Sequence, residues 1–381
     1  MTHLADRMPV APSPVTVPPM RVVFEEADRR QILQAIDQCL ASGWVAGGKH
    51  VKAFEECWAA YCRATHGVAC SSGGAALELI MKALDVQGKD VLVPTNTFIA
   101  TANAVTLAGG RPVFLDADPA TLGVSLKEIR RKVTDRTAAV MVVHIGGIMS
   151  AEMPAIAAWC KARKIWLVED AAHAHGSEAD GLRAGAFGVA AAYSFFATKV
   201  ITSGEGGMVV TNDDALAETC RRLRDYGKRS DWETVHTRIS TNYRMNELES
   251  IVALSQARRL DEFIAARQAA ADRYTEGLRG VLDLVLPAGR CSWYKYIVCL
   301  PEGVDRAEWK AQLKALGVSV SGGVYDLPLH LQPVFEPLGL RGTLPKAESV
   351  CARHVCLPIF YGMTAEQIDH VIASVRTVTA R

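Results

Sequence analysis

The sequence predicts an α/β protein in which a mostly parallel sheet lies between layers of helices. Short runs of strand length recur between residues 66 and 210, and each is apolar on successive residues, so both faces of the sheet must be buried. Stretches with helical spacing lie between several of these runs, an alternation that is typical of parallel sheets. The runs are His66–Cys70, Val91–Val93, Val113–Leu115, Ala139–Val143, Ile165–Val168, Ala190–Phe196 and Met208–Val210.

The elements before and between these strands follow from residue type and spacing. Five prolines among the first twenty residues predict a flexible arm at residues 1–20. Apolar residues at helical spacing from Ile32 to Leu40 predict a helix that ends at Gly43. The tight turn Ser71–Gly74 follows the first strand and opens another helix with one apolar face. Further helices are predicted at Leu126–Lys132 and Pro154–Ala162.

The pattern changes in the last third of the chain. No proline interrupts Met245–Leu278, and its apolar spacing predicts a helix that leads from a large domain, residues 21–255, into a small domain, residues 256–381. Trp293–Leu300 is predicted to be a strand. The remaining elements are a helix capped by Asp305 with Glu308 that runs through Leu316, and a last helix with the capping box Thr364 and Gln367. The second domain is therefore expected to be α+β.

Composition and charge exclude several classes of protein. The 381 residues exceed the size at which a single core stops growing, which favours two domains. Lys and Arg total 42 against 41 for Asp and Glu, so no excess charge favours a nucleic-acid or anionic-membrane partner. No apolar run reaches the roughly 18 residues that a membrane span requires. The ten scattered cysteines lack the spacing of a disulfide framework, which predicts a reducing cytoplasmic location.

Asp170 is the first candidate for chemistry. It follows the buried strand Ile165–Val168, and open α/β sheets bind ligands at the carboxyl ends of their strands. A carboxylate at this point could equally cap a following helix. Position alone leaves both interpretations open.

Lys199 is the second candidate, because it follows the strand Ala190–Phe196 in apolar surroundings. The glycine-rich loop Gly204–Gly207 comes next and would allow close approach of the backbone to a ligand. A lysine in apolar surroundings can lose its proton, and the neutral amine can form a Schiff base.

A Schiff-base lysine, a carboxylate for a ring nitrogen and a phosphate cradle are together what pyridoxal phosphate requires. The cradle is predicted at Ser71–Gly74, where a helix begins with free N–H groups, and Ser194 can add a hydroxyl group. Cradle, carboxylate and lysine follow one another along the chain, which makes the combination far more specific than any one of them.

Eight sequence blocks resemble the DegT-type sugar aminotransferases, which are fold-type I pyridoxal-phosphate enzymes. The resemblance runs from about Arg21 to Val375. It implies a large domain with a mostly parallel seven-stranded sheet between helices, followed by a smaller C-terminal α+β domain. The blocks are SGW at Ser42–Trp44, SSGGAALEL at Ser71–Leu79, PTNTFIATANAV at Pro94–Val105, VEDAAHAHGS at Val168–Ser177, YSFFATK at Tyr193–Lys199, GEGGMVVTND at Gly204–Asp213, NYRMNELES at Asn242–Ser250 and LPLHLQP at Leu327–Pro333.

The resemblance assigns a role to each matched residue. Lys199 would carry the Schiff base and move the proton during transamination, and Asp170 would keep the pyridine nitrogen protonated. Phe98 would stack on the ring. Phosphate contacts are implied for Gly73, Gly74 and Ser194, and for an asparagine, Asn242, that reaches into the neighbouring subunit of a homodimer with shared active sites.

Some positions depart from the common pattern of the family. Gly74 stands where threonine is usual, and His173 stands where glutamine is common, near the phenolic oxygen of the cofactor. We favour cofactor contact for His173 over a helix-packing role. Ala197, Val200 and Ile201 replace the more usual Pro and Asn-Leu around the lysine. The segments HAHG at residues 173–176 and TKVITSGEGG at residues 198–207 look somewhat like the branch that contains aminohydroxybenzoate synthase and inosose aminotransferases.

The expected activity is transfer of an amino group from glutamate or glutamine to a keto-sugar, most simply a nucleotide-linked one, in amino-sugar biosynthesis. An unlinked cyclitol or cyclic ketone is the alternative substrate. Lys199 argues against the related dehydratases, which have histidine there, and against a non-catalytic regulatory protein. Candidate substrate residues are Trp44, Arg244, Tyr325 and His330.

A metal site is not expected. The pair His173 and His175 is the one arrangement that could suggest zinc. Residues two positions apart point to opposite faces of a strand and do not share a helix face, so the pair does not predict a ligand set.

Overall fold

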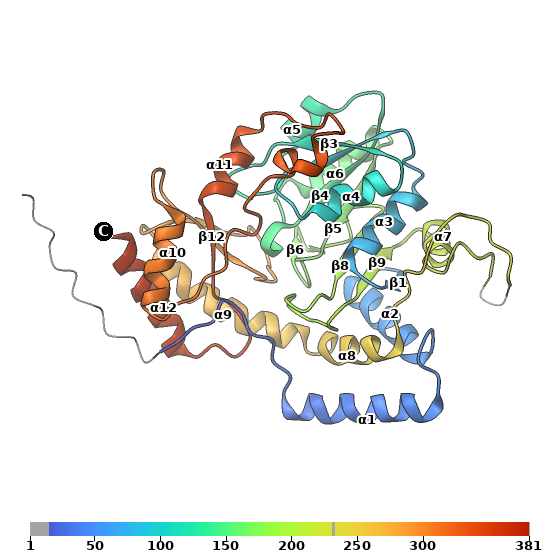
Figure 1. Ribbon diagram of the computed structural model, residues 1–381, viewed down its shortest axis with the longest axis horizontal. Coiled ribbons are helices and arrows are strands. Elements are labelled where there is room, and N and C mark those ends of the chain that lie inside the picture. Colours follow the sequence, from blue (N-terminus) through green and yellow to red (C-terminus); the bar gives the residue numbers. More distant parts are fainter. Residues whose placement is uncertain (1–14, 231–232, 381) are drawn as a thin grey trace, which may run out of the picture.

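The computed structural model describes residues 15–230 and 233–380 and contains the predicted sheet (Figure 1). Seven strands lie in the spatial order β1–β9–β8–β5–β4–β2–β3. Strand β9 is antiparallel to its neighbours β1 and β8, and the other pairs are parallel. Each predicted strand is confirmed, with ends that differ by no more than two residues. The strands are β1 (His66–Cys70), β2 (Asp90–Pro94), β3 (Arg111–Leu115), β4 (Thr137–Val143), β5 (Trp166–Asp170), β8 (Ala190–Ser194) and β9 (Gly207–Thr211).

Helices cover both faces of this sheet because successive side chains of a strand point to opposite sides. In β4, Met141 packs into the cluster that contains side chains of α3 and α4, whereas Val140 and Val142 pack with α5 and α6. The predicted burial of both faces is thus confirmed. The helices around the sheet are α2 (Lys49–Cys62), α3 (Gly73–Ala83), α4 (Ile99–Leu107), α5 (Leu126–Lys132), α6 (Met153–Ala162), α7 (Asp214–Arg224) and α8 (Glu247–Ala257).

The C-terminal part contains a three-stranded antiparallel sheet in the order β10–β11–β12, with helices packed beside it. The predicted caps are confirmed: Asp305 accepts hydrogen bonds at the start of α10, and Thr364 forms a capping box with Gln367 at the start of α12. The elements are β10 (Asp283–Val285), β11 (Tyr296–Cys299), β12 (His354–Leu357), α9 (Leu260–Leu278), α10 (Arg306–Ala315), α11 (Pro345–Arg353) and α12 (Ala365–Thr379). Short elements complete the fold: the hairpin β6 (Glu178–Ala179) and β7 (Leu182–Arg183), and the 3₁₀ turns η1 (Ile145–Gly147), η2 (Leu329–Leu331) and η3 (Pro333–Phe335).

Two predicted elements differ from the structure. The helix expected over Met245–Leu278 is divided into α8 and α9, because Arg259 leaves helical geometry and its side chain pairs with Asp28 and Glu262. The strand expected at Trp293–Leu300 is limited to Tyr296–Cys299, because Trp293 has a φ of 49°, which is incompatible with an extended strand. One apolar cluster includes side chains from both the N-terminal sheet and the C-terminal helices, so the domain limits at residue 255 stay a prediction.

The N-terminal segment runs along the outside of this body. Helix α1 (Glu26–Ser42) ends at Gly43 in the left-handed conformation, as predicted, and lies beside α8 (Figure 1). Val17, within the expected flexible arm, is buried and exchanges backbone hydrogen bonds with Gly317 and Ser319, so the arm is attached to the C-terminal part at this residue. Residues 1–14 of that arm lie outside the described residues. Within the described ranges, no helix combines the length and the apolar character needed to cross a membrane.

Candidate active site

Asp170 is the last residue of β5, and its carboxylate is buried. One oxygen accepts a hydrogen bond of 2.9 Å from the Thr101 hydroxyl in α4, and the other accepts one of 3.2 Å from the Ala172 amide. No helix begins in residues 171–189, all of which the structure describes, so Asp170 does not cap one. Burial raises the pKa of the Asp170 carboxyl group, while Thr101 and nearby Lys199 act in the opposite direction. A cationic group of a ligand placed here would favour the ionised carboxylate.

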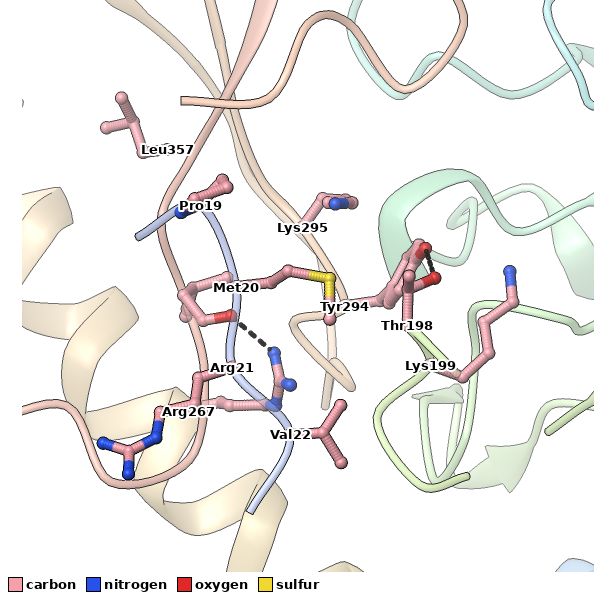
Figure 2. A pocket seen from close by; sticks show the side chains of 11 residues that line it. Pro19, Met20, Arg21, Val22, Thr198, Lys199, Arg267, Tyr294, Lys295 and Leu357 are labelled. Carbon is pink, nitrogen blue, oxygen red and sulfur yellow. Dashed lines mark hydrogen bonds between the residues drawn. The ribbon is translucent and has the colours of Figure 1, made fainter. Parts of the chain in front are cut away.

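Lys199 lies in a turn just after β8, because that strand ends at Ser194 rather than at the predicted Phe196. Its amine lies 4.7 Å from the centre of the Tyr294 ring, and the Tyr294 hydroxyl is 3.1 Å from Thr198 Oγ1 (Figure 2). Burial lowers the pKa of the Lys199 amine to about 7, with Asp170 opposing and Lys295 assisting the shift. A substantial fraction of this amine is therefore neutral at neutral pH and can attack a carbonyl carbon or accept a proton.

His173 is held between aromatic side chains in the same region. Its ring stacks on Tyr294 at 4.3 Å and lies 6.1 Å from the Tyr325 ring. Nδ1 accepts from the Gly146 amide at 3.3 Å, which leaves the proton of the neutral ring on Nε2, 3.3 Å from the Tyr325 hydroxyl. Burial, and next the charge of Lys199, lowers the pKa of His173, so the ring stays neutral. Residues around His173 form turns, so His173 does not lie on a helix.

The predicted cradle forms where α3 begins beside the ends of β8 and β9. Ser72 caps α3 by accepting from the Ala75 amide at 3.1 Å. A Cβ atom at Gly73 would lie 2.7 Å from Ser194 Cβ, and one at Gly207 would lie 2.1 Å from the Ser72 carbonyl oxygen. Glycine is therefore required at both positions, and the helix start presents bare backbone N–H groups beside the Ser194 hydroxyl.

Gly74 is different, because a Cβ there would meet only ordinary contacts, the nearest being Ala100 Cβ at 3.5 Å. The structure therefore has room for a side chain where the sequence has none. The absence of a side-chain hydroxyl group at Gly74 is therefore not imposed by steric constraints.

These residues fit pyridoxal phosphate. The glycine cradle and Ser194 suit its phosphate, and Asp170 suits its ring nitrogen. When bound, this cofactor supplies an aldehyde that condenses with amines and a ring that withdraws electrons. With the cofactor in this place, the Lys199 amine would accept and return a proton, and the buried Asp170 carboxylate would fix the ring.

Two further predicted residues lie in this region. The Tyr325 ring is 6.4 Å from the Phe98 ring, and the Tyr325 hydroxyl contacts His173. Phe98 precedes α4 and is 59% exposed, so its ring is free to meet a ligand.

Trp44, Asn242 and Arg244 lie elsewhere, on exposed surface. Trp44 is 56% exposed beside the start of α2. Asn242 accepts from the Arg244 amide, and the Arg244 guanidinium pairs with Asp225. Among the described residues, none of the three forms a hydrogen bond, ion pair or ring contact with Lys199 or Asp170, so one chain does not bring them into the cluster.

His330 is also separate from the cluster. It is fully buried, with Nδ1 2.7 Å from the Thr95 hydroxyl and Nε2 3.1 Å from Glu348. Both ring nitrogens are occupied by the protein, which favours a structural role over substrate binding.

The histidines considered as zinc ligands do not converge. His173 faces Gly146 and Tyr325, whereas His175 Nε2 bonds the Ser194 carbonyl at 2.9 Å. A different group, Cys39 with His50 and Glu247, has potential ligand atoms within 4.8 Å of one another. The Glu247 carboxylate already accepts from three backbone amides at the start of α2, which indicates helix capping.

Sequence analysis missed four residues that support the cluster. Thr101 holds Asp170, Tyr294 and Thr198 hold the region around Lys199, and Lys295 lies beside Tyr294. Thr101 stands within the matched block Pro94–Val105, so its place in that motif could have identified it as a site residue. Tyr294 and Lys295 come from the C-terminal part, and no local pattern links them to Lys199, which precedes Tyr294 by 95 residues.

Comparison with known proteins agrees with this site. The model of the DegT/DnrJ/EryC1/StrS aminotransferase family matches residues 26–376. The chain is 37% identical over 354 residues to the pleiotropic regulatory protein of Geobacillus stearothermophilus, covering 91% of this chain and 93% of that protein. It is 35% identical over 353 residues to GDP-perosamine synthase of Caulobacter vibrioides, covering 90% and 93%. The crystal structure of DesV from S. venezuelae superposes with a TM-score of 0.90 at 33% identity, covering 97% of this chain and 100% of DesV.

The match extends over nearly the whole chain and includes each segment that builds the cluster. The chain belongs to the DegT/DnrJ/EryC1/StrS aminotransferase family and is a pyridoxal-phosphate-dependent sugar aminotransferase.

Proposed function

We propose that this enzyme moves the amino group of glutamate or glutamine to a nucleotide-linked keto-sugar during the biosynthesis of an amino sugar. The carrying observation is the Lys199 amine, whose pKa of about 7 suits proton transfer at neutral pH, close to the buried Asp170 carboxylate. The nucleotide-linked substrate is supported by the similarity to GDP-perosamine synthase. A cytoplasmic location is part of this proposal, supported by ten cysteines that are all free thiols.

The proposal assigns cofactor contacts residue by residue. Gly73, Gly74 and Ser194 bind the phosphate, Phe98 covers the ring, and His173 contacts the phenolic oxygen. The cradle geometry and the neutral state of His173 support these roles. Tyr325 is then a substrate contact beside His173.

The proposal also includes a homodimer with shared active sites. Asn242 and Arg244 stand in a matched motif yet lie on exposed surface, away from the Lys199 cluster of their own chain. Helix α1 adds Leu33 and Leu40, which are 66% and 57% exposed, and Trp44 follows it. Apolar and motif residues gathered on exposed surface fit a face that a second copy covers, where Asn242 would complete the partner's phosphate site.

A substrate panel tests the reaction. Purified holoenzyme is incubated with nucleotide-linked keto-sugars and with unlinked cyclitol ketones, and consumption of glutamate or glutamine is measured. We expect consumption with a nucleotide-linked sugar. Consumption only with a cyclitol ketone would contradict the nucleotide-linked substrate and favour the alternative substrate class. A purified protein without the absorbance of bound cofactor, and without turnover after cofactor is added, would instead favour a regulatory role.

A further inference from the structure

A pocket beside Lys199 is lined by four basic residues and by no acidic one. These are Arg21, Lys199, Arg267 and Lys295, which come from the N-terminal segment, the large sheet and the C-terminal part. Figure 2 shows Lys199 on one side of Tyr294, with Arg267 and the N-terminal segment on the other. A concentration of positive charge in one partly closed space is complementary to an anion.

Among the described residues, Lys295 has no carboxylate partner that would balance its charge. Its amine lies 4.9 Å from the centre of the Tyr294 ring, and the Lys199 amine lies 4.7 Å from the same centre. Residues 15–230 and 233–380 contain no carboxylate in salt-bridge contact with Lys295, in contrast to Lys82 and Lys228, which pair with Glu78 and Asp225. Burial, assisted by Arg267, lowers the pKa of the Lys295 amine. Keeping an unpaired cation in such surroundings is costly, so a ligand that supplies the opposite charge would be favoured.

Arg267 adds a second uncompensated charge. Its side chain is 6% exposed, and Nη1 donates to the backbone carbonyls of Trp293 and Ile359 at 3.0 and 2.9 Å. Its Nε is buried and has no hydrogen-bond partner among the described residues. Burial lowers the pKa of this guanidinium to about 10. The two carbonyl groups are neutral, so they hold the Arg267 side chain in place without compensating its positive charge.

The segment that carries Lys295 is held rigidly at some energetic cost. Trp293 adopts a φ of 49°, a left-handed conformation that is strained for a bulky residue. Ser292 counteracts this by bonding the Ser177 hydroxyl through its amide and the His173 carbonyl through its hydroxyl. The Lys295 amide bonds the Gly146 carbonyl at 3.2 Å. Strain retained by such a network commonly marks a functional position, here the one that places Lys295 beside Tyr294.

We propose that Lys295, assisted by Arg267, binds the carboxylate of the amino-acid donor. This inference rests on the proposed function. A carboxylate on the carbon that carries the reacting amine must lie close to Lys199, and Lys295 approaches the same tyrosine ring. The phosphate of a nucleotide-linked sugar offers the same charge, but the sugar ring separates it from the reacting carbon. Lys295 is thus a binding residue that determines which amine donors are accepted.

Binding and the donor half-reaction test this proposal in the holoenzyme. Glutarate, a dicarboxylate without an amine, is titrated calorimetrically, and L-glutamate is added without sugar while the cofactor absorbance is followed. We expect Lys295→Met to weaken glutarate binding by about tenfold or more and to raise the glutamate concentration for half-maximal rate by a similar factor. This is the effect expected from the loss of one hydrogen bond to a charged group. Lys295→Arg should restore most of the loss. The exposed Lys314→Met in α10 is the matched control and should change neither quantity.

GDP separates the two sources of anionic charge. We expect GDP to bind the wild type and Lys295→Met within about twofold of each other. Loss of GDP binding with unchanged glutarate and glutamate binding would overturn the carboxylate assignment, as would unchanged binding of all three. Melting temperature and near-ultraviolet circular dichroism confirm that each variant is folded. If no amino acid converts the wild-type cofactor, the proposed function fails, whereas a Lys295-dependent glutarate site would still be detected.

Discussion

The two regions that carry motif residues differ in how completely one chain builds them. Around Lys199, side chains from β5, α4 and the C-terminal part hold one another through short contacts, and Asp170 is almost fully buried. Around Asn242, the motif residues Asn242 and Arg244 are exposed, and among the described residues the Asn242 side chain bonds the Arg244 amide while the Arg244 guanidinium pairs with Asp225. The difference shows that one chain brings Lys199 and Asp170 together by itself, and it supports the proposed homodimer, in which a second copy would cover Asn242 and Arg244.

Loss of the Lys199 amine tests the first region most severely. We expect Lys199→Ala to abolish transamination, since no other amine occupies that turn, while the fold is retained. Turnover is measured with a coupled donor assay, and Lys314→Ala is the control because that lysine is exposed. Normal turnover in Lys199→Ala would remove Lys199 from the mechanism.

Asp170→Asn tests the electrostatic part of the same region. The amide can keep a contact with Thr101 but carries no charge to stabilise a protonated ring nitrogen. We expect a loss of turnover on the order of 100-fold or more, as for other preorganised electrostatic partners. Thr101→Val is a useful companion, since it removes only the hydroxyl group and should cause a smaller loss. A loss below about threefold in Asp170→Asn would leave Asp170 a structural residue.

Asn242→Ala tests the second region. If Asn242 binds the phosphate in a partner subunit, its loss should weaken cofactor binding by about 10- to 100-fold, the range for one hydrogen bond to a charged group. Cofactor affinity is measured by absorbance titration of the apoprotein, and sedimentation should give twice the chain mass.

Mixing variants sharpens this test. Lys199→Ala chains and Asn242→Ala chains are each impaired, but in a mixed dimer one site carries both changes and the other carries neither. We expect partial recovery of activity after chain exchange. A monomer in sedimentation, or no recovery despite proven exchange, would contradict the shared site.

His330 belongs to neither region, and its role is structural on the evidence of its contacts. His330→Ala removes hydrogen bonds to Thr95 and Glu348 and leaves a cavity, so we expect the free energy of unfolding to fall by about 2–4 kcal/mol. The Michaelis constant for the sugar should stay within twofold of the wild type. The exposed His236→Ala is the control for denaturation. A large increase in the Michaelis constant at unchanged stability would return His330 to the substrate site.

His330 is also an example of a residue whose contacts could not be predicted from the sequence. The strands and the caps of α10 and α12 were predictable because apolar runs and capping residues act locally. Asp170 and Lys199 were predictable because parallel strands end at one edge of a sheet. Whether a motif histidine faces a cavity or is bonded to other parts of the protein depends on long-range packing. The positions of Tyr294 and Lys295 near Lys199 depend on long-range packing in the same way. The left-handed backbone conformation of Trp293 could not be predicted, because the residue at this position is not a glycine.

The smallest expected effect concerns protonation. The pKa of Lys199 is about 7, against 10.5 for an unperturbed lysine, because burial disfavours the charged amine. Between these two values the unfolded chain binds more protons than the folded one, so the contribution of Lys199 to the stability of the apoprotein rises with pH across that window. The amine itself becomes reactive as the pH rises through about 7.

Competitive labelling with trace acetic anhydride, read by mass spectrometry, measures this directly in the apoprotein. We expect Lys199 to reach half its maximal reactivity near pH 7, and the exposed Lys314, labelled in the same sample, serves as the internal reference for the extent of reaction. Lys295→Met removes a positive charge that opposes protonation of Lys199, so the midpoint should move upward, by less than about one pH unit at the separation and effective dielectric involved. A Lys199 midpoint near the ordinary lysine value of 10.5 would show that burial does not prepare this amine for reaction, and the first region would then depend on the bound cofactor alone for its reactivity.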